Sequence, residues 1–177
     1  MKKDDNIILI GMPGVGKSTV GVLLAKRLGF SFIDTDIYIQ AHEGKRLQEI
    51  IKKIGLSGFC DLEERYMLSI SGSTNVIATG GSVVYRDKAM QHLKSIGVVA
   101  HLDLDAENLE KRLENMAARG VVRKPGQSLE GLYNERHPLY MRYADFTVMC
   151  LGLTAEQVME RIQSRPDGEH LSATRTR

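Results

Sequence analysis

The sequence predicts an α/β protein in which strands and helices alternate along the chain. An apolar, β-branched run at 6–10 leads into a glycine-rich loop at 11–19, and a helix with one apolar face follows that loop to residue 28. Further short apolar runs alternate with segments of helical periodicity and lie at 30–33, 75–78, 97–102 and 146–150. This alternation is typical of βαβ units and an open parallel sheet.

Composition and charge narrow the function classes. The chain has 177 residues, 42% of them hydrophobic, and a net charge of +2, which gives no sign of a strongly basic nucleic-acid surface. No apolar run approaches the roughly 20 residues that a membrane span needs. The charged N-terminus leads directly into a strand, unlike a signal peptide, and Cys60 and Cys150 form no disulfide framework or metal-ligand spacing. We therefore expect a cytoplasmic protein that binds a small molecule, with no nucleic-acid or membrane partner.

The loop at 11–19 matches the phosphate-binding pattern G-x-x-x-x-G-K-[ST]. Its glycines let backbone N–H groups converge on an anion, and the helix N-terminus adds a favourable dipole. A glycine-rich turn with a chance Lys-Ser pair is the alternative, but the strand before the loop and the helix after it disfavour that interpretation. Lys17 is expected on the β- and γ-phosphates and Ser18 on Mg²⁺. The residues predicted to bind ATP are Gly11, Gly14, Val15, Gly16, Lys17, Ser18 and Thr19.

Two acidic residues follow the second strand, in Asp34-Thr35-Asp36. Ligands of open α/β sheets collect beyond the carboxyl ends of the strands, which places both carboxylates beside the phosphate loop. One of them is suited to position Mg²⁺ and the other to accept a proton from an incoming hydroxyl group. The alternative is a solvated turn whose aspartate caps the next helix.

Residues 37–70 show helical periodicity that Gly55 and Gly58 interrupt. This segment is long for a simple crossover, which favours an acceptor-binding region. Glu63 and Glu64 are expected to be solvated helix charges. After the strand at 75–78, the pair Gly80-Gly81 either brings a ligand close to backbone N–H groups or makes a tight turn.

The rest of the chain completes the pattern. His101 is expected to be an ordinary strand residue. Residues 116–127 form a basic connection that either closes over nucleotide or is a solvated loop. Helices are predicted at 106–115, at 129–141 with a kink at Pro138, and at 154–162. We expect a single domain over residues 1–163 and a disordered tail at 164–177.

Taken together, these motifs resemble the shikimate kinase family, a group of kinases similar to nucleoside-monophosphate kinases. The resemblance covers roughly residues 6–163 and depends on the phosphate loop, Asp34-Thr35-Asp36, Phe59 with Glu63, Gly80-Gly81 and Arg136-His137-Pro138-Leu139-Tyr140. It implies a five-stranded parallel sheet flanked by helices, with a helical acceptor-binding region and a lid.

The resemblance also implies roles for single residues. On the phosphate side it assigns Lys17 and Ser18 to phosphate and Mg²⁺, Asp34 to the surroundings of the metal, Arg112 to adenine and the lid residue Arg119 to the transferring phosphate. On the acceptor side, Asp36 orients the reacting hydroxyl, Gly80 and Gly81 present N–H groups, and Arg136 binds a carboxylate. Positions 60 and 82, here Cys60 and Ser82, belong to the same acceptor site.

This sequence departs from the family pattern at three places. Cys60 stands where the family has a second carboxylate-binding arginine, whose charge-assisted hydrogen bond is worth roughly 1.5–3 kcal/mol. Ser82 replaces a third glycine, and a positive φ at this position would strain it by roughly 1–2 kcal/mol. Gly120-Val121-Val122 replaces Pro-Leu-Leu after the lid arginine.

The sequence thus predicts an enzyme that transfers the γ-phosphoryl group of ATP, with Mg²⁺, to a hydroxyl group of a small metabolite that bears a carboxylate. Shikimate is the acceptor that the resemblance implies. Homoserine is one alternative, because Arg136 suits its carboxylate and Asp61 its ammonium group, and gluconate is another. A nucleotide-binding regulatory module without turnover is a third interpretation. The sequence leaves the oligomeric state open, with a monomer as one option.

Overall fold

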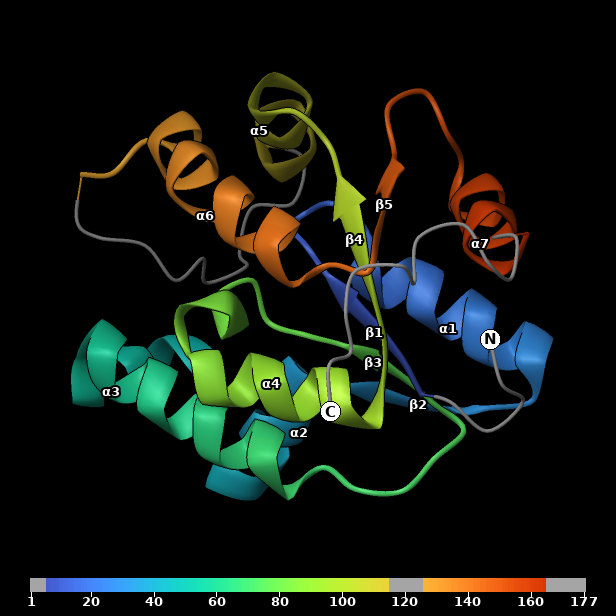
Figure 1. Cartoon of the computed structure of the whole chain (residues 1–177). Helices are drawn as coiled ribbons and strands as arrows, with labels where there is room; N and C mark the ends of the chain where they lie inside the picture. Colours follow the sequence, from blue (N-terminus) through green and yellow to red (C-terminus); the bar gives the residue numbers. More distant parts are fainter. Residues whose placement is uncertain (1–5, 115–125, 165–177) are drawn as a thin grey trace.

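The computed structural model describes residues 6–114 and 126–164. Five strands form one sheet in the order β2-β3-β1-β4-β5, and every neighbouring pair is parallel (Figure 1). The strands are β1 (Asn6–Ile10), β2 (Ser31–Asp34), β3 (Asn75–Ala78), β4 (Gly97–Asp103) and β5 (Phe146–Met149). The predicted five-stranded parallel sheet is confirmed.

The strand register brings the loops that carry the predicted site to one edge of the sheet. Ala78, the last residue of β3, pairs with Leu9 of β1 and with Asp34 of β2. Because all strands run in the same direction, the phosphate loop, the two aspartates and the Gly80-Gly81 turn follow strand ends at this same edge.

The central strand β1 is buried along its whole length, and its four apolar residues are at most 1% exposed. Such a continuous apolar run is typical of a strand covered on both faces. Its first residue, Asn6, is polar and buried, and its side-chain amide is fully used. Nδ2 donates to the carbonyl groups of Gly72 and Ile96, and Oδ1 accepts from the N–H of Asn75. Asn6 therefore joins the chain segments that enter β1, β3 and β4.

Seven helices are found in the described part of the chain. They are α1 (Lys17–Leu28), α2 (Thr35–Glu43), α3 (Leu47–Ser69), α4 (Asp87–Ile96), α5 (Ala106–Glu114), α6 (Leu129–Tyr143) and α7 (Ala155–Gln163), and a short 3₁₀ turn, η1, spans Val83–Tyr85. Figure 1 shows α1 and α7 together on one side of the sheet and α3, α4 and α6 on the other. None of the described helices is long and apolar enough to span a bilayer.

The structure differs from the sequence prediction in several elements. Helix α4 was not predicted, although Ala89, Met90 and Leu93 form a buried face with helical spacing. The helical segment predicted at 37–70 is two helices, separated after Gly44, where φ is 62°. Gly55 interrupts α3 with φ 73° and ψ 174°, whereas Gly58 stays helical. Beyond Ser164, the predicted tail lies outside the described residues.

Candidate active site

The phosphate loop has the backbone conformation that its glycines predict. Gly14 and Gly16 have φ angles of 84° and 109°, which side chains other than glycine rarely adopt. Gly16 is also the N-cap of α1, so the N–H groups at the start of this helix border the loop. Val15 is buried and its N–H donates to Met12 O at 3.3 Å, which closes the turn. Together these features make the loop a cradle for an anion.

Lys17 is the first residue of α1 and lies at the mouth of this loop. Its side chain is largely buried, and Nζ donates to the carbonyl oxygens of Gly11 at 2.8 Å and Met12 at 2.9 Å. The ammonium group is therefore held over the loop, where the charge of a bound phosphate would attract it. Thr19 follows two residues later in the first turn of the helix.

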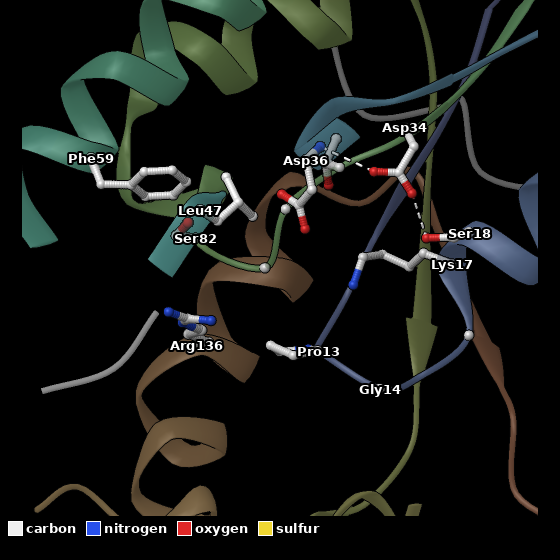
Figure 2. Close-up of a pocket in the computed structure, with 14 residues that line it drawn as sticks. Pro13, Gly14, Lys17, Ser18, Asp34, Asp36, Leu47, Phe59, Ser82 and Arg136 are labelled. Atoms are coloured by element: carbon white, nitrogen blue, oxygen red, sulfur yellow. Dashed lines mark hydrogen bonds between the residues drawn. The ribbon is translucent and has the colours of Figure 1, made fainter. Parts of the chain in front are cut away.

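Ser18 and Asp34 meet between α1 and the end of β2 (Figure 2). Ser18 Oγ donates to Asp34 Oδ2 at 2.6 Å, and Asp34 Oδ1 accepts from the N–H groups of Asp36 and Ile37. Asp34 is thus the N-cap of α2, as one of the two interpretations expected, and it is also the partner of Ser18. A hydroxyl and a carboxylate oxygen side by side fit Mg²⁺, which is usually bound by few protein ligands and by substrate phosphates.

One cavity joins the phosphate loop to the predicted acceptor side (Figure 2). The loop contributes Pro13, Gly14, Gly16, Lys17 and Ser18. The opposite part of the cavity is lined by Asp36, Leu47, Phe59, Gly81, Ser82 and Arg136. These residues come from β-strand ends and from α2, α3 and α6, so the cavity exists only when the chain is folded.

Glycine is needed at positions 80 and 81 because a side chain would not fit there. The backbone angles do not require it, since neither residue has a positive φ. A Cβ atom on Gly81 would lie 2.9 Å from Pro13 Cδ and 3.0 Å from Arg136 Nη1. A Cβ atom on Gly80 would overlap Glu63 Oε1 and lie 2.8 Å from Asp36 Oδ1. The two glycines therefore let four side chains approach the backbone of this turn.

The N–H of Gly80 donates to Thr35 Oγ1 at 3.0 Å, so it is already engaged within the protein. This differs from the expectation that Gly80 offers this group to the acceptor. Ser82 has φ −90° and ψ −10°, an ordinary right-handed conformation, so the strain considered for a serine at this position is absent. Its buried hydroxyl donates instead to Glu63 Oε2 at 2.7 Å.

Arg136 lines the cavity from α6 and is only 1% exposed. Its Nε donates to the hydroxyl of Tyr85 at 3.0 Å, and its guanidinium carbon lies 5.0 Å from the centroid of the Tyr85 ring. The Tyr85 hydroxyl in turn donates to Glu135 Oε1 at 2.7 Å. A buried cation held in one orientation at a cavity wall is suited to bind the carboxylate of a ligand.

Cys60 is buried on α3 but is not among the described residues that line the cavity, and its neighbour Phe59 lines it instead. Burial raises the pKa of the Cys60 thiol. Asp61 is exposed, and its carboxylate is 2.7 Å from the guanidinium group of Arg86. Asp61 is therefore paired with a cation at the surface. It no longer supports homoserine as the acceptor, whose ammonium group it was expected to suit.

Glu63 belongs to the motifs of the family resemblance, but the sequence analysis missed its burial beside the site. The expectation of a solvated charge is wrong for this residue, because its side chain is fully buried and burial raises its pKa to about 8. The burial of Glu63 could have been predicted from the helical spacing of apolar residues in the sequence. Glu63 lies four residues after Phe59 and four before Met67, so it shares the buried face of α3 with these two apolar residues.

Three further residues were considered in the sequence analysis: Arg112, Arg119 and His101. Arg112 Nη1 donates to the carbonyl of Val15 at 3.1 Å, which places it beside the phosphate loop. Arg119, together with most of the basic connection, lies outside the described residues. His101 is buried in β4 and stacks on Tyr140 with ring centroids 5.1 Å apart, and burial lowers its pKa to about 4.

Comparison with known proteins agrees with this geometry. Residues 13–166 match the family model described as shikimate kinase. The chain belongs to the shikimate kinase family. A shikimate kinase from Thermodesulfovibrio yellowstonii is 42% identical over 160 residues, which cover 89% of this chain and 92% of the relative. One from Persephonella marina is 36% identical and covers 90% of this chain and 98% of the relative.

Solved structures give the same result for the fold. The structure of shikimate kinase from Acinetobacter baumannii in complex with shikimate has a TM-score of 0.82 and 31% identity, and the match covers 90% of each chain. Shikimate kinase from Aquifex aeolicus has a TM-score of 0.76 and 32% identity, over 89% of this chain and 94% of that one. As a member of this family, the protein is an ATP-dependent phosphotransferase that acts on a hydroxyl group and uses Mg²⁺.

Proposed function

We propose that this protein transfers the γ-phosphoryl group of ATP to a hydroxyl group of shikimate. The observation that carries this proposal is the composition of one cavity. Its wall contains the phosphate-loop residue Lys17, the carboxylate of Asp36 and the buried guanidinium group of Arg136. A small acceptor with a carboxylate and a hydroxyl group matches the last two, and ATP matches the first.

On the nucleotide side, the loop at 11–19 supplies N–H groups to the phosphates. Lys17 exchanges its two backbone carbonyl partners for oxygens of the β- and γ-phosphates. Arg112 stands beside the loop. The family resemblance assigns the lid arginine, Arg119, to the transferring phosphate. Ser18 and Asp34 would hold Mg²⁺, which would neutralise part of the phosphate charge.

On the acceptor side, Arg136 binds the carboxylate and Asp36 orients the reacting hydroxyl group. The hydroxyl oxygen forms a bond to the γ-phosphorus while the bond to the bridging oxygen breaks, so ADP leaves with that electron pair. The hydroxyl proton passes to Asp36. Little covalent chemistry is left to the protein, so its contribution is mainly positioning and charge stabilisation.

A coupled assay of ADP release tests this proposal with shikimate, homoserine and gluconate as acceptors. We expect kcat/KM to be at least about tenfold higher for shikimate than for the other two, which corresponds to about 1.4 kcal/mol in transition-state binding. No shikimate-dependent ADP release would overturn the proposal. A higher kcat/KM for homoserine or gluconate would mean that this compound, and not shikimate, is the acceptor. Nucleotide binding without turnover on any acceptor would favour a regulatory module.

A further inference from the structure

A buried carboxyl group lies directly behind the acceptor side of the cavity. Glu63 is fully buried, and its Oε2 accepts the hydrogen bond of Ser82. Its Oε1 has no hydrogen-bond partner among the described residues, and it lies against the Cα atom of Gly80, where a Cβ atom would overlap it. Gly80 and Ser82 line the cavity but Glu63 is not among the lining residues. Glu63 therefore supports the turn from behind and does not reach the acceptor itself.

The same carboxyl group is next to the residue that receives the proton. Asp36 Oδ1 lies 2.8 Å from the position of a Cβ atom on Gly80, on the same turn that Glu63 Oε1 contacts. Two acidic side chains thus flank one glycine. Two carboxylates that both carry a charge repel each other at such short range, so the structure is stable only if one of them is neutral or compensated.

The charged groups around Glu63 show which carboxyl group is neutral. Burial raises its pKa to about 8, and Asp36 on α2 acts in the same direction. The Ser82 hydrogen bond, Arg136 on α6 and Lys17 on α1 oppose this shift. Cys60 and Asp61, which precede Glu63 on α3, supply no positive charge. Glu63 is therefore mostly protonated at neutral pH, and Asp36 is left as the proton acceptor.

Ser82 is the residue that fits this arrangement. With φ −90° its backbone is unstrained, so the hydroxyl group is gained without a conformational cost. A glycine or alanine at position 82 would remove the one hydrogen bond that the structure shows for the Glu63 carboxyl group. A buried carboxyl group without any partner is costly, and the turn would shift to satisfy it.

We propose that Ser82 and Glu63 form a positioning pair for the acceptor. The Ser82 hydroxyl holds the Glu63 carboxyl group against Gly80, and this contact sets the turn at 80–82 and Asp36 in the place where the reacting hydroxyl group binds. The pair thereby determines how well the acceptor is bound and aligned, without contacting it. This inference rests on the proposed transfer to shikimate.

Steady-state kinetics of Ser82→Ala and Ser82→Gly test the pair, with Ser69→Ala as a control. Ser69 is an exposed serine at the end of α3 that donates only to the carbonyl of Tyr66. We expect the KM for shikimate to rise about tenfold in both Ser82 variants, while the KM for ATP changes less than about twofold. Equal changes in both KM values, or an unchanged KM for shikimate, would overturn the inference.

Substitutions at Glu63 test its protonation. Glutamine has the shape of a protonated glutamate and still accepts from Ser82, so Glu63→Gln should keep the KM for shikimate within about threefold of wild type at pH 7. Glu63→Ala should raise the KM for shikimate as much as Ser82→Ala does. The double variant should raise this KM no further than Glu63→Ala alone. If Glu63→Gln is as damaging as Glu63→Ala, the carboxylate charge itself acts and the positioning role is wrong. Should Glu63→Ala fail to fold, the glutamine and Ser82 variants alone decide.

The inference and the proposed function fail in different ways. Wild-type protein that does not phosphorylate shikimate would refute the function. The hydrogen bond of the pair is tested without turnover by thermal unfolding, in which Ser82→Ala should lower the melting temperature and Ser69→Ala should not. A melting temperature that is equal in the two variants would refute the pair.

Discussion

The hydroxyl group of Ser18 donates a 2.6 Å hydrogen bond to the carboxylate of Asp34, and this bond joins the first turn of α1 to the end of β2. The other oxygen of the same carboxylate caps helix α2. One side chain thus takes part in the phosphate site and in the stability of the fold. The charge can be removed while the cap is kept, because asparagine retains the cap and alanine does not.

Substitution of Asp34 separates these two functions. The free energy of unfolding of Asp34→Asn should lie within about 0.5 kcal/mol of wild type. That of Asp34→Ala should be about 1–2 kcal/mol lower, because the helix cap is lost. Both variants should lose Mg²⁺-dependent transfer at least tenfold, because the charge that faces the metal is gone. Urea unfolding and the Mg²⁺ dependence of turnover measure the two effects. Full transfer in Asp34→Asn would contradict the assignment to the metal.

Removal of the ammonium group at position 17 should abolish transfer. Lys17→Ala takes away a charge that stabilises the transferring phosphoryl group, an effect worth about 100-fold or more in kcat. Lys26→Ala, an exposed position on the same helix, is the control and should be neutral. ATP with Mg²⁺ should raise the melting temperature of wild type by mass action and that of Lys17→Ala much less. Turnover of Lys17→Ala within a few-fold of wild type would exclude the phosphate role.

The role of Asp36 is tested by Asp36→Asn, which keeps the shape and removes the proton acceptor. Turnover with saturating shikimate should fall about 100-fold or more, while the affinity for ATP should change less than about threefold, because the loop at 11–19 binds the nucleotide. Asp61→Asn, at an exposed aspartate, is the control. A collapse of ATP affinity with intact transfer would mean that Asp36 has a different role.

An arginine at position 60 distinguishes between acceptors. Cys60 is buried beside Phe59, which lines the cavity, and supplies no charge. In Cys60→Arg, a long side chain that reaches the cavity would add a second cation for the carboxylate that Arg136 is proposed to bind. The KM for shikimate should fall about tenfold, or about 1.4 kcal/mol, whereas activity on homoserine should fall because its ammonium group is repelled. Steady-state kinetics on both substrates measure the change. If neither activity changes, position 60 does not reach the acceptor.

The buried carboxyl group of Glu63 makes stability depend on pH. Its pKa is about 8 in the folded protein against 4.5 as the ordinary value, so the folded state keeps a proton that the unfolded state releases between these values. This stabilisation is complete below pH 4.5 and is lost as pH rises towards 8, by up to about 1.4 kcal/mol for each pH unit. Above pH 8 it does not change further.

Urea unfolding of wild type and Glu63→Gln at pH 6 and pH 9 measures this dependence. Glutamine does not titrate, so the stability of wild type relative to the variant should decrease from pH 6 to pH 9. Glu64→Gln, at the adjacent and only partly buried carboxylate of α3, should follow wild type. Parallel pH profiles for wild type and Glu63→Gln would show that Glu63 is ionised in the folded protein.

Local patterns in the sequence were sufficient to predict the conformation of the phosphate loop. The loop at 11–19 and its strand and helix are contiguous, and the chemistry of Gly16, Lys17 and Ser18 depends on backbone angles and helix ends that neighbouring residues set. Asp34 ends β2 and Asp36 follows two residues later, and parallel pairing alone brings this end to the edge of the sheet where the loop lies. The five strands were predicted to within one residue at each end, because short buried runs have a clear apolar signal.

The acceptor side was decided by tertiary structure. Glu63, Ser82 and Arg136 come from three separate segments, and no local pattern states that the first is buried against the second. In the sequence, Ser82 was noted only as a replacement of a glycine. The structure gives its hydroxyl group a role, because it donates to Glu63, 19 residues earlier in the chain. Gly80 and Gly81 are needed because side chains from α2, α3 and α6 crowd their Cα atoms. Burial and long-range contacts set the charge state of Glu63, and these exist only after the helices have packed on the sheet.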